Sequence, residues 1–489
     1  RQDVLERCAM RCGQRREWQQ DTAVDVGFSA VAEMGNQRKH RRRRHPCCSF
    51  AHFLYSRQQQ ARNREDFPFD PRKVDAVVLS HAHIDHSGRL PLLVQRGFAG
   101  PIYAQSATAD FCKIMLEDSA RLAEGDAETE NRKRDRKDLP HVTPLYTLAD
   151  VERTLRQLVP LPYEKKREIL PGISICFQDA GHILGSACVE VWMQAGALSR
   201  KLVFSGDLGQ YNTPILRDPA PLTDADLVIM ESTYGDRLHR EHEATIAEIA
   251  EIIADADHRR GNILIPSFAV GRSQELLYLF SKYYAAWQLH RWKIFLDSPM
   301  AIRASEIYWD NEKLYDQEAR LMRAGLEGMR PLPNLTLSRT PEQSQHINRL
   351  QSGAIIIAGS GMCEGGRIVH HLKHNVWRRE CEVIIVGWQA AGTRGRQLVD
   401  GSTHVRIHHE TIRVQARIHT IGGLSAHGDQ NDMARWYSSF RPAPPVYLVH
   451  GEAQAAQGLV GRLRKDGAPA VSIAARGMRV NPATLEQHV

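Results

Sequence analysis

The chain has 489 residues and a net charge of +7, with 42% hydrophobic and 25% charged residues, a balance typical of a globular protein of two to four domains. No apolar run is long enough to span a bilayer, and the N-terminus lacks the apolar segment of a secretory signal, so we expect neither a membrane protein nor a secreted one. The nine cysteines are odd in number and form no CxxC pair, which favours reduced thiols in a cytoplasmic protein.

Residues 1–60 differ in composition from the rest of the sequence. They are rich in Arg and Gln and show neither strand alternation nor convincing helix caps. Basic side chains cluster at 38–44 and again at 132–137. Such runs favour polyanionic partners, although charge alone does not identify a nucleic acid. We expect segment 1–60 to be disordered, because it cannot bury enough apolar surface to offset the entropy of ordering.

From about residue 61 the sequence has the pattern of an α/β protein. Short apolar runs predict strands at 74–79, 102–104, 173–178, 188–193, 201–205 and 227–230, and the patterns between them predict helices at 107–117 and 148–158. After Glu231 the sequence shifts to regular strand–turn–helix units, with strands at 262–266, 294–296, 354–358 and 383–386 and a helix from Gly271 through Phe280. We therefore predict one α/β domain interrupted by a second, doubly wound one.

A cluster of potential metal ligands follows the predicted strand at 74–79. His81, His83, Asp85 and His86 fall within six residues, where a tight turn can direct several side chains into one pocket. Imidazole and carboxylate together suit Zn²⁺ or a similar ion. Two histidines separated by one residue can share one metal, and the adjacent Asp-His pair can face a second.

Four further histidines and aspartates occur at predicted strand ends or turns. They are His182 in a Gly-rich loop, Asp207 after the strand at 201–205, and the late residues His427 and His450. Asp207 can bridge two metals. A single histidine beside glycine is usually structural, but the ordered set after the first cluster is a specific signal.

These motifs together resemble the β-CASP nuclease branch of the metallo-β-lactamase superfamily, which includes ribonuclease J and the endonuclease of pre-mRNA 3′-end cleavage. The resemblance covers roughly residues 62–452. It implies an αββα metallo-β-lactamase fold with an inserted Rossmann-like β-CASP domain. The implied divisions are an atypical N-terminal segment, two parts of the metallo-β-lactamase domain and the insert between them, at 1–60, 61–233, 234–413 and 414–489.

The resemblance also assigns roles to individual residues. It implies two Zn²⁺ ions, the first held by His81, His83 and His182, the second by Asp85, His86 and His450, with Asp207 bridging them. The implied catalytic residues are Asp85, Glu231 and His427. His427, held by Glu231, is expected to protonate the leaving 3′-oxygen. The implied activity is endonucleolytic hydrolysis of RNA phosphodiester bonds by a two-metal mechanism. We expect RNA as the substrate and no membrane partner, and a homodimer is left open.

The inserted segment carries Gly-rich turns after its predicted strands, and no Walker lysine follows them, so we do not expect nucleotide triphosphate binding. We predict that phosphate groups of the substrate contact Ser267, Arg272, Ser360, Gly361 and Arg394. Tight packing turns are the alternative explanation.

The sequence departs from the family pattern at its N-terminus. Family members begin with strands that end in Asp-Cys-Gly, and no counterpart is found in residues 1–60, so we expect those strands to be missing or replaced and the activity to be weak. Only residues 453–489 follow the last motif, so we expect the extra C-terminal domain of ribonuclease J to be absent. The altered N-terminus leaves open a non-catalytic or impaired RNA-binding homologue. A small-molecule hydrolase of the same fold is a third reading, which the large insert, Glu231, His427 and His450 disfavour.

Overall fold

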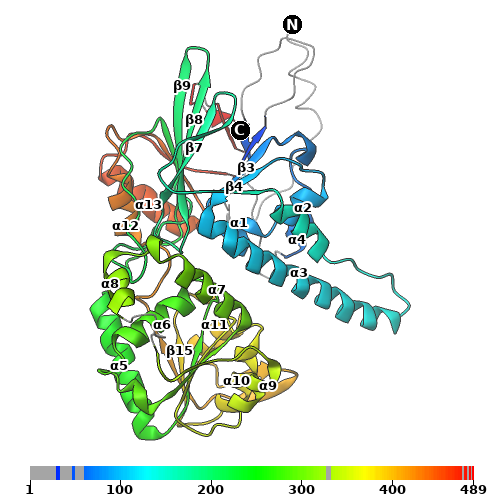
Figure 1. Ribbon diagram of the computed structural model, residues 1–489, viewed down its shortest axis with the longest axis vertical. Coiled ribbons are helices and arrows are strands. Elements are labelled where there is room, and N and C mark those ends of the chain that lie inside the picture. Colours follow the sequence, from blue (N-terminus) through cyan, green and yellow to red (C-terminus); the bar gives the residue numbers. More distant parts are fainter. Residues whose placement is uncertain are drawn as a thin grey trace.

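The structure is a computed structural model that describes residues 29–33, 47–49, 60–325, 332–475, 478–481, 484–485 and 487–488. Two α/β parts lie one above the other in Figure 1. The upper part contains two sheets and the two ends of the described chain, and the lower part is built from the middle of the sequence. The active-site residues predicted above all belong to the upper part or to the loops that face it.

The first sheet of the upper part has five strands in the order β2–β1–β3–β4–β5. Their bounds are β1 (Ser29–Glu33), β2 (Cys47–Ser49), β3 (Ala76–Leu79), β4 (Ile102–Gln105) and β5 (Leu158–Leu161). The strands β3, β4 and β5 are parallel, and β1 joins β3 in antiparallel fashion. Helices on the outer face are α1 (Ile84–Ser87), α2 (Leu90–Gln95), α3 (Ser106–Asp135) and α4 (Leu148–Leu155).

The second sheet has seven strands in the order β20–β19–β10–β9–β8–β7–β6. Their bounds are β6 (Arg167–Leu170), β7 (Ile173–Asp179), β8 (Ala187–Ala195), β9 (Leu198–Phe204), β10 (Leu227–Glu231), β19 (Val446–Val449) and β20 (Val471–Ile473). The outer face is covered by α12 (Gln430–Tyr437) and α13 (Ala453–Lys465). A final pair of short strands is β21 (Arg479–Val480) with β22 (Gln487–His488).

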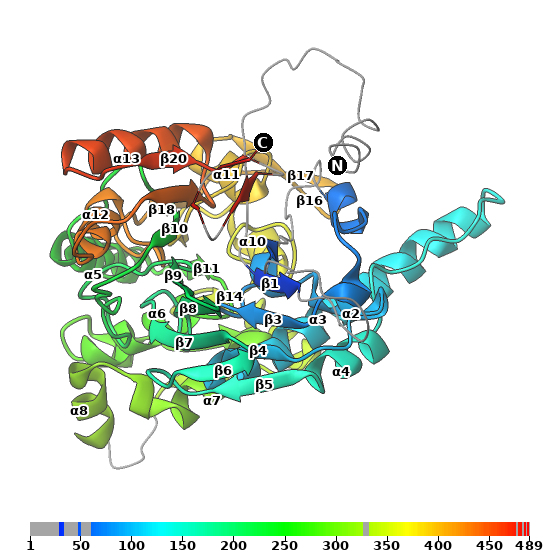
Figure 2. The same cartoon turned by 90° about the horizontal axis from the view of Figure 1, so that it is seen from above.

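Apolar side chains fill the space between these two sheets. Val78 of β3 packs with Phe177 of β7 and Val189 of β8, and all three are buried. Inner strands such as β3 and β10 are covered on both faces, so their apolar runs are nearly continuous. With helices outside both sheets, the layers are α, β, β and α (Figure 2), which is the αββα arrangement expected from the sequence.

The lower part is a six-stranded sheet in the order β13–β12–β14–β11–β15–β18, with all strands parallel. The strands are β11 (Ile263–Pro266), β12 (Lys293–Asp297), β13 (Leu335–Leu337), β14 (Ala354–Ala358), β15 (Glu382–Ile385) and β18 (Arg417–Thr420). The hairpin β16 (His404–Ile407) and β17 (Glu410–Arg413) lies beside it.

Helices cover both faces of this lower sheet, as the doubly wound pattern predicts. One face packs on α5 (His242–Arg259), α6 (Arg272–Lys282) and α7 (Pro299–Asp310), and α8 (Gln317–Gly325) follows them. The other packs on α10 (Arg367–Asn375) and α11 (Arg394–Val399), with α9 (Pro341–Ile347) nearby. Because the strands are parallel, the loops after them meet at one edge of the sheet.

Three expectations about the fold need correction. The helix expected at 107–117 continues to Asp135 and extends away from the body in both views (Figures 1 and 2). The strand β18 pairs with β15, so the inserted sheet includes Arg417–Thr420, beyond the expected boundary at 413. Segment 1–60 was expected to contribute no strand, yet β1 and β2 extend the first sheet. The rest of residues 1–59, including the basic run at 38–44, lies outside the described residues.

No helix in the described part of the chain is both long and apolar enough to cross a membrane. Five cysteines, Cys112, Cys176, Cys188, Cys363 and Cys381, are buried and carry free thiols, as expected. The cytoplasmic location and the homodimer considered from the sequence stay predictions.

Candidate active site

The strands of the upper part end at one place, and this convergence assembles the site. Parallel pairing of β9, β10 and β19 brings the residues after them to one edge, where Asp207, Glu231 and His450 lie. The turn after β3 supplies the first histidine cluster from the opposing sheet, and the loop between β7 and β8 supplies His182. Residues far apart in sequence therefore meet because of topology.

Gly206 allows the sharp turn that places Asp207. Its φ of +57° lies in the left-handed region, and an added Cβ would lie 2.6 Å from the carbonyl oxygen of Ala187. Only glycine satisfies both conditions without strain. The glycine before Asp207 is therefore required by the backbone geometry of the site.

Four of the predicted ligands form a first group, which we call cluster 1: His81, His83, His182 and Asp207. His83 Nδ1 lies 3.2 Å from His81 Nε2 and 3.0 Å from His182 Nε2. Asp207 Oδ2 lies 3.5 Å from His81 Nε2 and 3.7 Å from His182 Nε2. His81, His182 and Asp207 are buried, and His83 is partly exposed.

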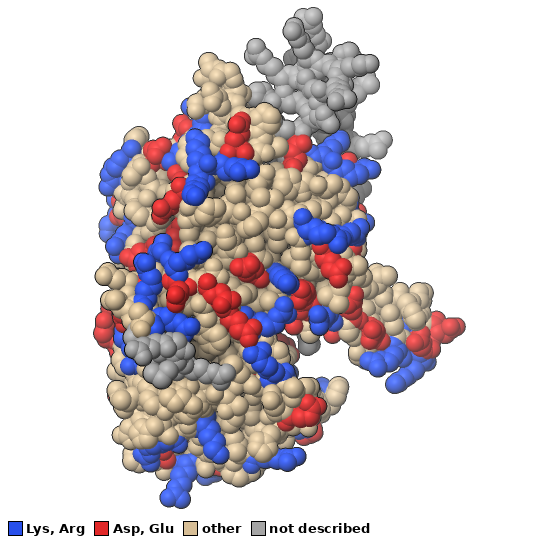
Figure 3. Space-filling model, viewed as in Figure 1, with Lys and Arg blue, Asp and Glu red and all other residues tan. Residues whose placement is uncertain are grey.

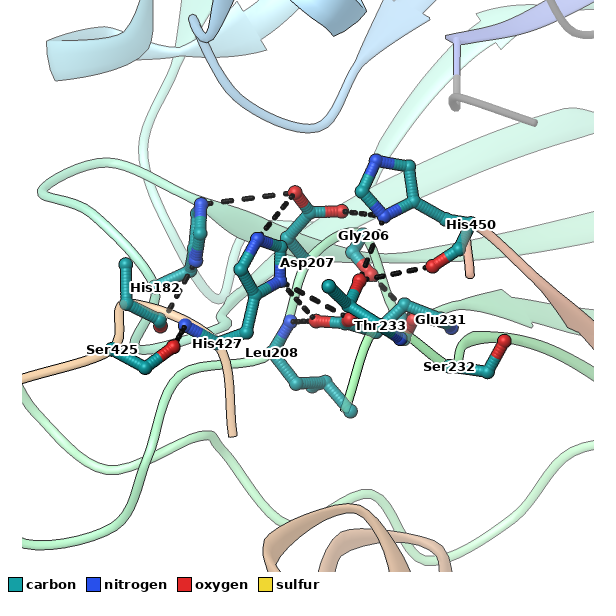
Figure 4. A network of polar contacts seen from close by, with 12 residues as sticks. His182, Gly206, Asp207, Leu208, Glu231, Ser232, Thr233, Ser425, His427 and His450 are labelled. Carbon is teal, nitrogen blue, oxygen red and sulfur yellow. Dashed lines mark hydrogen bonds and ion pairs between the residues drawn. The ribbon is translucent and has the colours of Figure 1, made fainter. Parts of the chain in front are cut away.

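The other ligands form cluster 2, which comprises Asp85, His86, His450 and again Asp207. His86 Nε2 lies 3.3 Å from Asp207 Oδ2 and 3.6 Å from Asp85 Oδ2. His450 Nε2 lies 3.6 Å from Asp85 Oδ2, and its Nδ1 lies 3.7 Å from Asp207 Oδ1. The structure thus brings all seven predicted ligands together, with Asp207 shared between the clusters (Figure 4 shows Asp207 between His182 and His450).

The donor spacing fits metal ions. Ligand atoms about 2.0–2.1 Å from a tetrahedral zinc ion lie roughly 3.3 Å from one another. The distances between ligand atoms given above for cluster 1 range from 3.0 to 3.7 Å and so are close to this value. Asp207 Oδ1 is buried and accepts no hydrogen bond from the described residues. A buried carboxylate oxygen without such a partner is costly unless a cation satisfies it. The residues therefore suit two metal ions that share one carboxylate.

The two clusters differ in protonation. Burial lowers the pKa of His83 to about 4 and holds the pKa values of His81 and His182 well below their ordinary range. Cluster 1 therefore presents neutral imidazoles at pH 7, the form that binds a metal. In cluster 2 burial also opposes the charged imidazole, but Asp207 and Asp85 outweigh it and raise the pKa values of His86 and His450.

Glu231 and His427 form a second functional pair beside the clusters. The Nδ1 atom of His427 lies 3.0 and 3.2 Å from the two carboxylate oxygens of Glu231. Its Nε2 atom lies 4.0 Å from Asp207 Oδ2. Burial lowers the pKa of His427, but the Glu231 carboxylate outweighs burial, so the net shift is upward. The imidazole is therefore poised to carry a proton next to the metal ligands.

Two contacts that the sequence did not reveal orient these histidines. The Nδ1–H group of His182 donates to the backbone carbonyl of Ala426, 3.0 Å away, which directs Nε2 at cluster 1. The hydroxyl of Thr233 donates to the carbonyl of His450 at 2.9 Å and lies 3.0 Å from His450 Nδ1. Such partners fix which ring nitrogen faces a metal. No residue pattern could have identified them, because they depend on contacts between distant segments.

The loop that carries His427 is held by a helix cap and by His239. Asp429 begins α12 and accepts hydrogen bonds from the backbone N–H groups of Asn431 and Asp432 at 2.8 and 3.0 Å. His239 Nε2 lies 2.9 Å from the carbonyl oxygen of His427, and its backbone N–H donates to Asp429. The structure adds His239 to the residues that position this loop.

The predicted phosphate contacts lie after strands of the lower sheet, but several polar groups are engaged locally. Ser360 Oγ accepts from the backbone N–H groups of Glu364 and Gly365, at 3.2 and 3.3 Å. The Arg394 guanidinium donates to the carbonyl oxygens of Cys363 and Arg406.

Arg272 and Ser267 are engaged in the same way. Arg272 is buried and pairs with Glu275, and Ser267 Oγ lies 3.0 Å from Ser273 Oγ. Arg272 also lines a small pocket with His182 and Ser425, where the lower part meets the upper. The two arginines thus have partners within their own domain, and contact with substrate phosphate stays a prediction.

Three family models match successive parts of the chain. Residues 56–246 match the metallo-beta-lactamase superfamily, residues 273–398 the Beta-Casp domain, and residues 411–473 the Zn-dependent metallo-hydrolase RNA specificity domain.

Curated relatives match over most of the described chain. A protein of Thermus thermophilus named ribonuclease TTHA0252 is 38% identical over 403 residues, which are 82% of this chain and 86% of that protein. Proteins named transcription termination factor FttA are 29% identical in Methanocaldococcus jannaschii and 30% in Thermococcus kodakarensis, over 78% and 82% of this chain. This chain spans 59% and 60% of their lengths.

Proposed function

Because this chain belongs to the β-CASP group of the metallo-β-lactamase superfamily, we propose that it is a metal-dependent ribonuclease that hydrolyses phosphodiester bonds of RNA. One observation carries the proposal: an imidazole paired with a buried carboxylate lies beside two ligand clusters that share Asp207. Phosphodiester hydrolysis needs an activated water and a proton for the leaving oxygen. The site offers groups for both.

We propose two zinc ions, one in each cluster. Ions bound there would activate a water molecule as nucleophile and offset the negative charge on the phosphoryl oxygens. Asp207, which belongs to both clusters, would be a ligand common to the two sites. The zinc-dependent description of the matched RNA specificity domain supports this metal.

The side chains then divide the proton transfers. Asp85 is partly exposed at the cluster surface and would accept a proton released by the attacking water. His427 would donate a proton from Nε2 to the leaving 3′-oxygen, while Glu231 holds Nδ1. The products would be a 5′-phosphate and a 3′-hydroxyl. A general acid of this kind contributes typically ~10²–10⁴-fold in rate.

The substrate class rests on the relative named a ribonuclease and on the RNA specificity model that matches residues 411–473. That model spans both His427 and His450, so the match includes the acid and a cluster 2 ligand. We propose internal cleavage, because the branch that the sequence motifs resemble includes the endonuclease of pre-mRNA 3′-end cleavage. A small-molecule hydrolase would not need the entire lower domain.

The test is digestion of labelled RNA by the zinc-loaded full chain. Linear and circular forms of the same single-stranded sequence separate the modes: cleavage of the circle requires internal hydrolysis. Products with 5′-phosphate and 3′-hydroxyl ends are expected, and a chelator should abolish cleavage. The His427→Ala variant with full zinc content serves as the matched negative control. Absence of RNA cleavage by zinc-loaded protein that hydrolyses a β-lactam or thioester instead would overturn the proposal.

A further inference from the structure

Two large aromatic side chains are exposed at the edge of the lower sheet where its strands end. Phe268 follows β11 and is 43% exposed, and Trp388 follows β15 and is 48% exposed. The strands β11 and β15 pair in parallel, so both residues emerge at the same edge. Neither side chain contributes to the hydrophobic clusters of that domain.

Glycines in the neighbouring loops support the aromatic rings. A Cβ added to Gly361 would lie 2.8 Å from two ring carbons of Phe268, so the ring rests directly on the backbone there. The Nε2 atom of Gln389 donates to the carbonyls of Gly361 and Gly387, at 3.0 and 3.1 Å. The loop that carries Trp388 is thereby tied to the backbone on which the Phe268 ring lies.

The loop that contains Phe268 contacts the loop that carries a cluster 1 ligand. It ends at Gly271, where an added Cβ would lie 3.1 Å from Ile183 Cγ2. Ile183 is adjacent in sequence to the cluster 1 residue His182, and Gly271 and His182 line the same small pocket. The loop that contains Phe268 therefore belongs to the side of the lower domain that meets the metal-ligand clusters.

The chemistry of this edge favours flat apolar groups over charged ones. The arginines of its loops are occupied, Arg272 by Glu275 and Arg394 by backbone carbonyls. On the face drawn in Figure 3, Lys and Arg are interspersed with Asp and Glu rather than gathered in one basic patch. Every nucleobase has a π-face that can stack on an aromatic ring, and unpaired bases are the usual targets of such contacts.

We propose that Phe268 and Trp388 form a stacking platform for unpaired bases of the RNA strand whose scissile phosphate lies at the clusters. This inference rests on the proposed ribonuclease function. The platform makes the enzyme selective for single-stranded RNA, because bases within a duplex cannot present a free face. Both residues are positioning residues, which hold the strand and take no part in proton transfer.

Conservative substitutions test the platform. The leucine variants Phe268→Leu and Trp388→Leu keep an apolar side chain but remove the aromatic ring. The variants Phe268→Tyr and Trp388→Phe keep an aromatic ring on which a base can stack. Trp377 follows α10, lies at the opposite edge of the same sheet and is 51% exposed, so Trp377→Leu is a matched control. Zinc content and circular dichroism of each full-length variant should equal those of the wild type.

The first measurement is steady-state cleavage of a single-stranded oligoribonucleotide by the zinc-loaded variants. Base stacking of this kind predicts KM values raised roughly 5- to 150-fold for each leucine variant, with kcat nearly unchanged. The tyrosine and phenylalanine variants and the Trp377 control should retain wild-type KM. Unchanged KM in both leucine variants, or an equal loss in the control, overturns the platform.

The second measurement separates this inference from the proposed function. Binding of the same oligoribonucleotide is followed with metal removed, through quenching of tryptophan fluorescence. Quenching that disappears in Trp388→Leu supports the platform even if no cleavage is ever observed. Cleavage by the wild type without any contribution of Trp388 to quenching would leave the ribonuclease proposal standing and refute the platform. Equally tight binding of duplex RNA would also refute it.

Discussion

Replacing Thr233 with valine should weaken metal binding at cluster 2 and leave cluster 1 intact. The hydroxyl of Thr233 makes two contacts with one residue, at 2.9 Å to the carbonyl oxygen of His450 and 3.0 Å to its Nδ1 atom. Since the hydroxyl donates to the carbonyl, it accepts from the Nδ1–H group. This arrangement leaves Nε2 facing Asp85. Valine has nearly the same shape and lacks both hydrogen bonds.

The expected magnitude follows from these two bonds. A hydrogen bond of this kind contributes ~1 kcal/mol net, so losing two costs about 2 kcal/mol. That free energy corresponds to roughly 30-fold weaker binding, within the ~10–100-fold range found when a partner of a metal-binding histidine is removed. Thr233→Ser keeps the hydroxyl and should bind zinc like the wild type.

Competition with a chromophoric zinc chelator measures the two affinities separately. In Thr233→Val one equivalent should bind as in the wild type and the second more weakly. Imidazole ¹⁵N shifts should show a change in the proton position on His450 in this variant alone. Two equivalents bound with wild-type affinity in Thr233→Val would refute the reasoning, as would an equal loss in Thr233→Ser.

Three further predictions follow from the site. Acidification should release metal from cluster 2 before cluster 1. Carboxylates raise the pKa values of His86 and His450 in cluster 2 despite burial, so protons compete with the metal for these histidines at a higher pH. The zinc content per chain should therefore fall in two steps across a pH titration, and a single step would contradict this. Glu231→Gln should lower the pKa of His427, so RNA cleavage, which needs the protonated acid, should decline at a lower pH than in the wild type; a pH–kcat profile that does not move would reject the assignment. Gly206→Ala should lower the free energy of unfolding by more than about 1 kcal/mol and displace Asp207, because the added Cβ would meet the backbone at a positive φ. The denaturation midpoint and the zinc content should both fall. A stable variant that binds zinc fully would show that the turn can adapt.

The ligands were predictable because each stands at the end of an apolar run. His81 and Asp207 follow buried strands, and the ends of such strands meet at one edge of a sheet. The resemblance to the β-CASP family added the pairing of Glu231 with His427. Side-chain types and strand ends are local properties of sequence, so this part of the site could be read without a structure.

The rest depended on properties that a sequence does not display locally. The second half of α3 is charged throughout and lacks the apolar periodicity that marks a helix, so the predicted helix ended at Glu117. Three of the four residues of the strand Arg417–Thr420 are polar, so its sequence gave no strand signal. Thr233 and Ala426 act through a hydroxyl and a backbone carbonyl on remote segments, which no motif identifies.

The position of the inserted domain has a consequence for synthesis of the protein. Cluster 2 needs His450, and His182 of cluster 1 is held by Ala426, so both clusters depend on a segment translated after the whole insert. At ~5–20 residues per second, a ribosome needs tens of seconds to pass from one half of the site to the other. A chain released early by premature termination would contain most of the sheets and the four ligands of cluster 1, but it would lack the cluster 2 ligand His450 and the paired imidazole of His427.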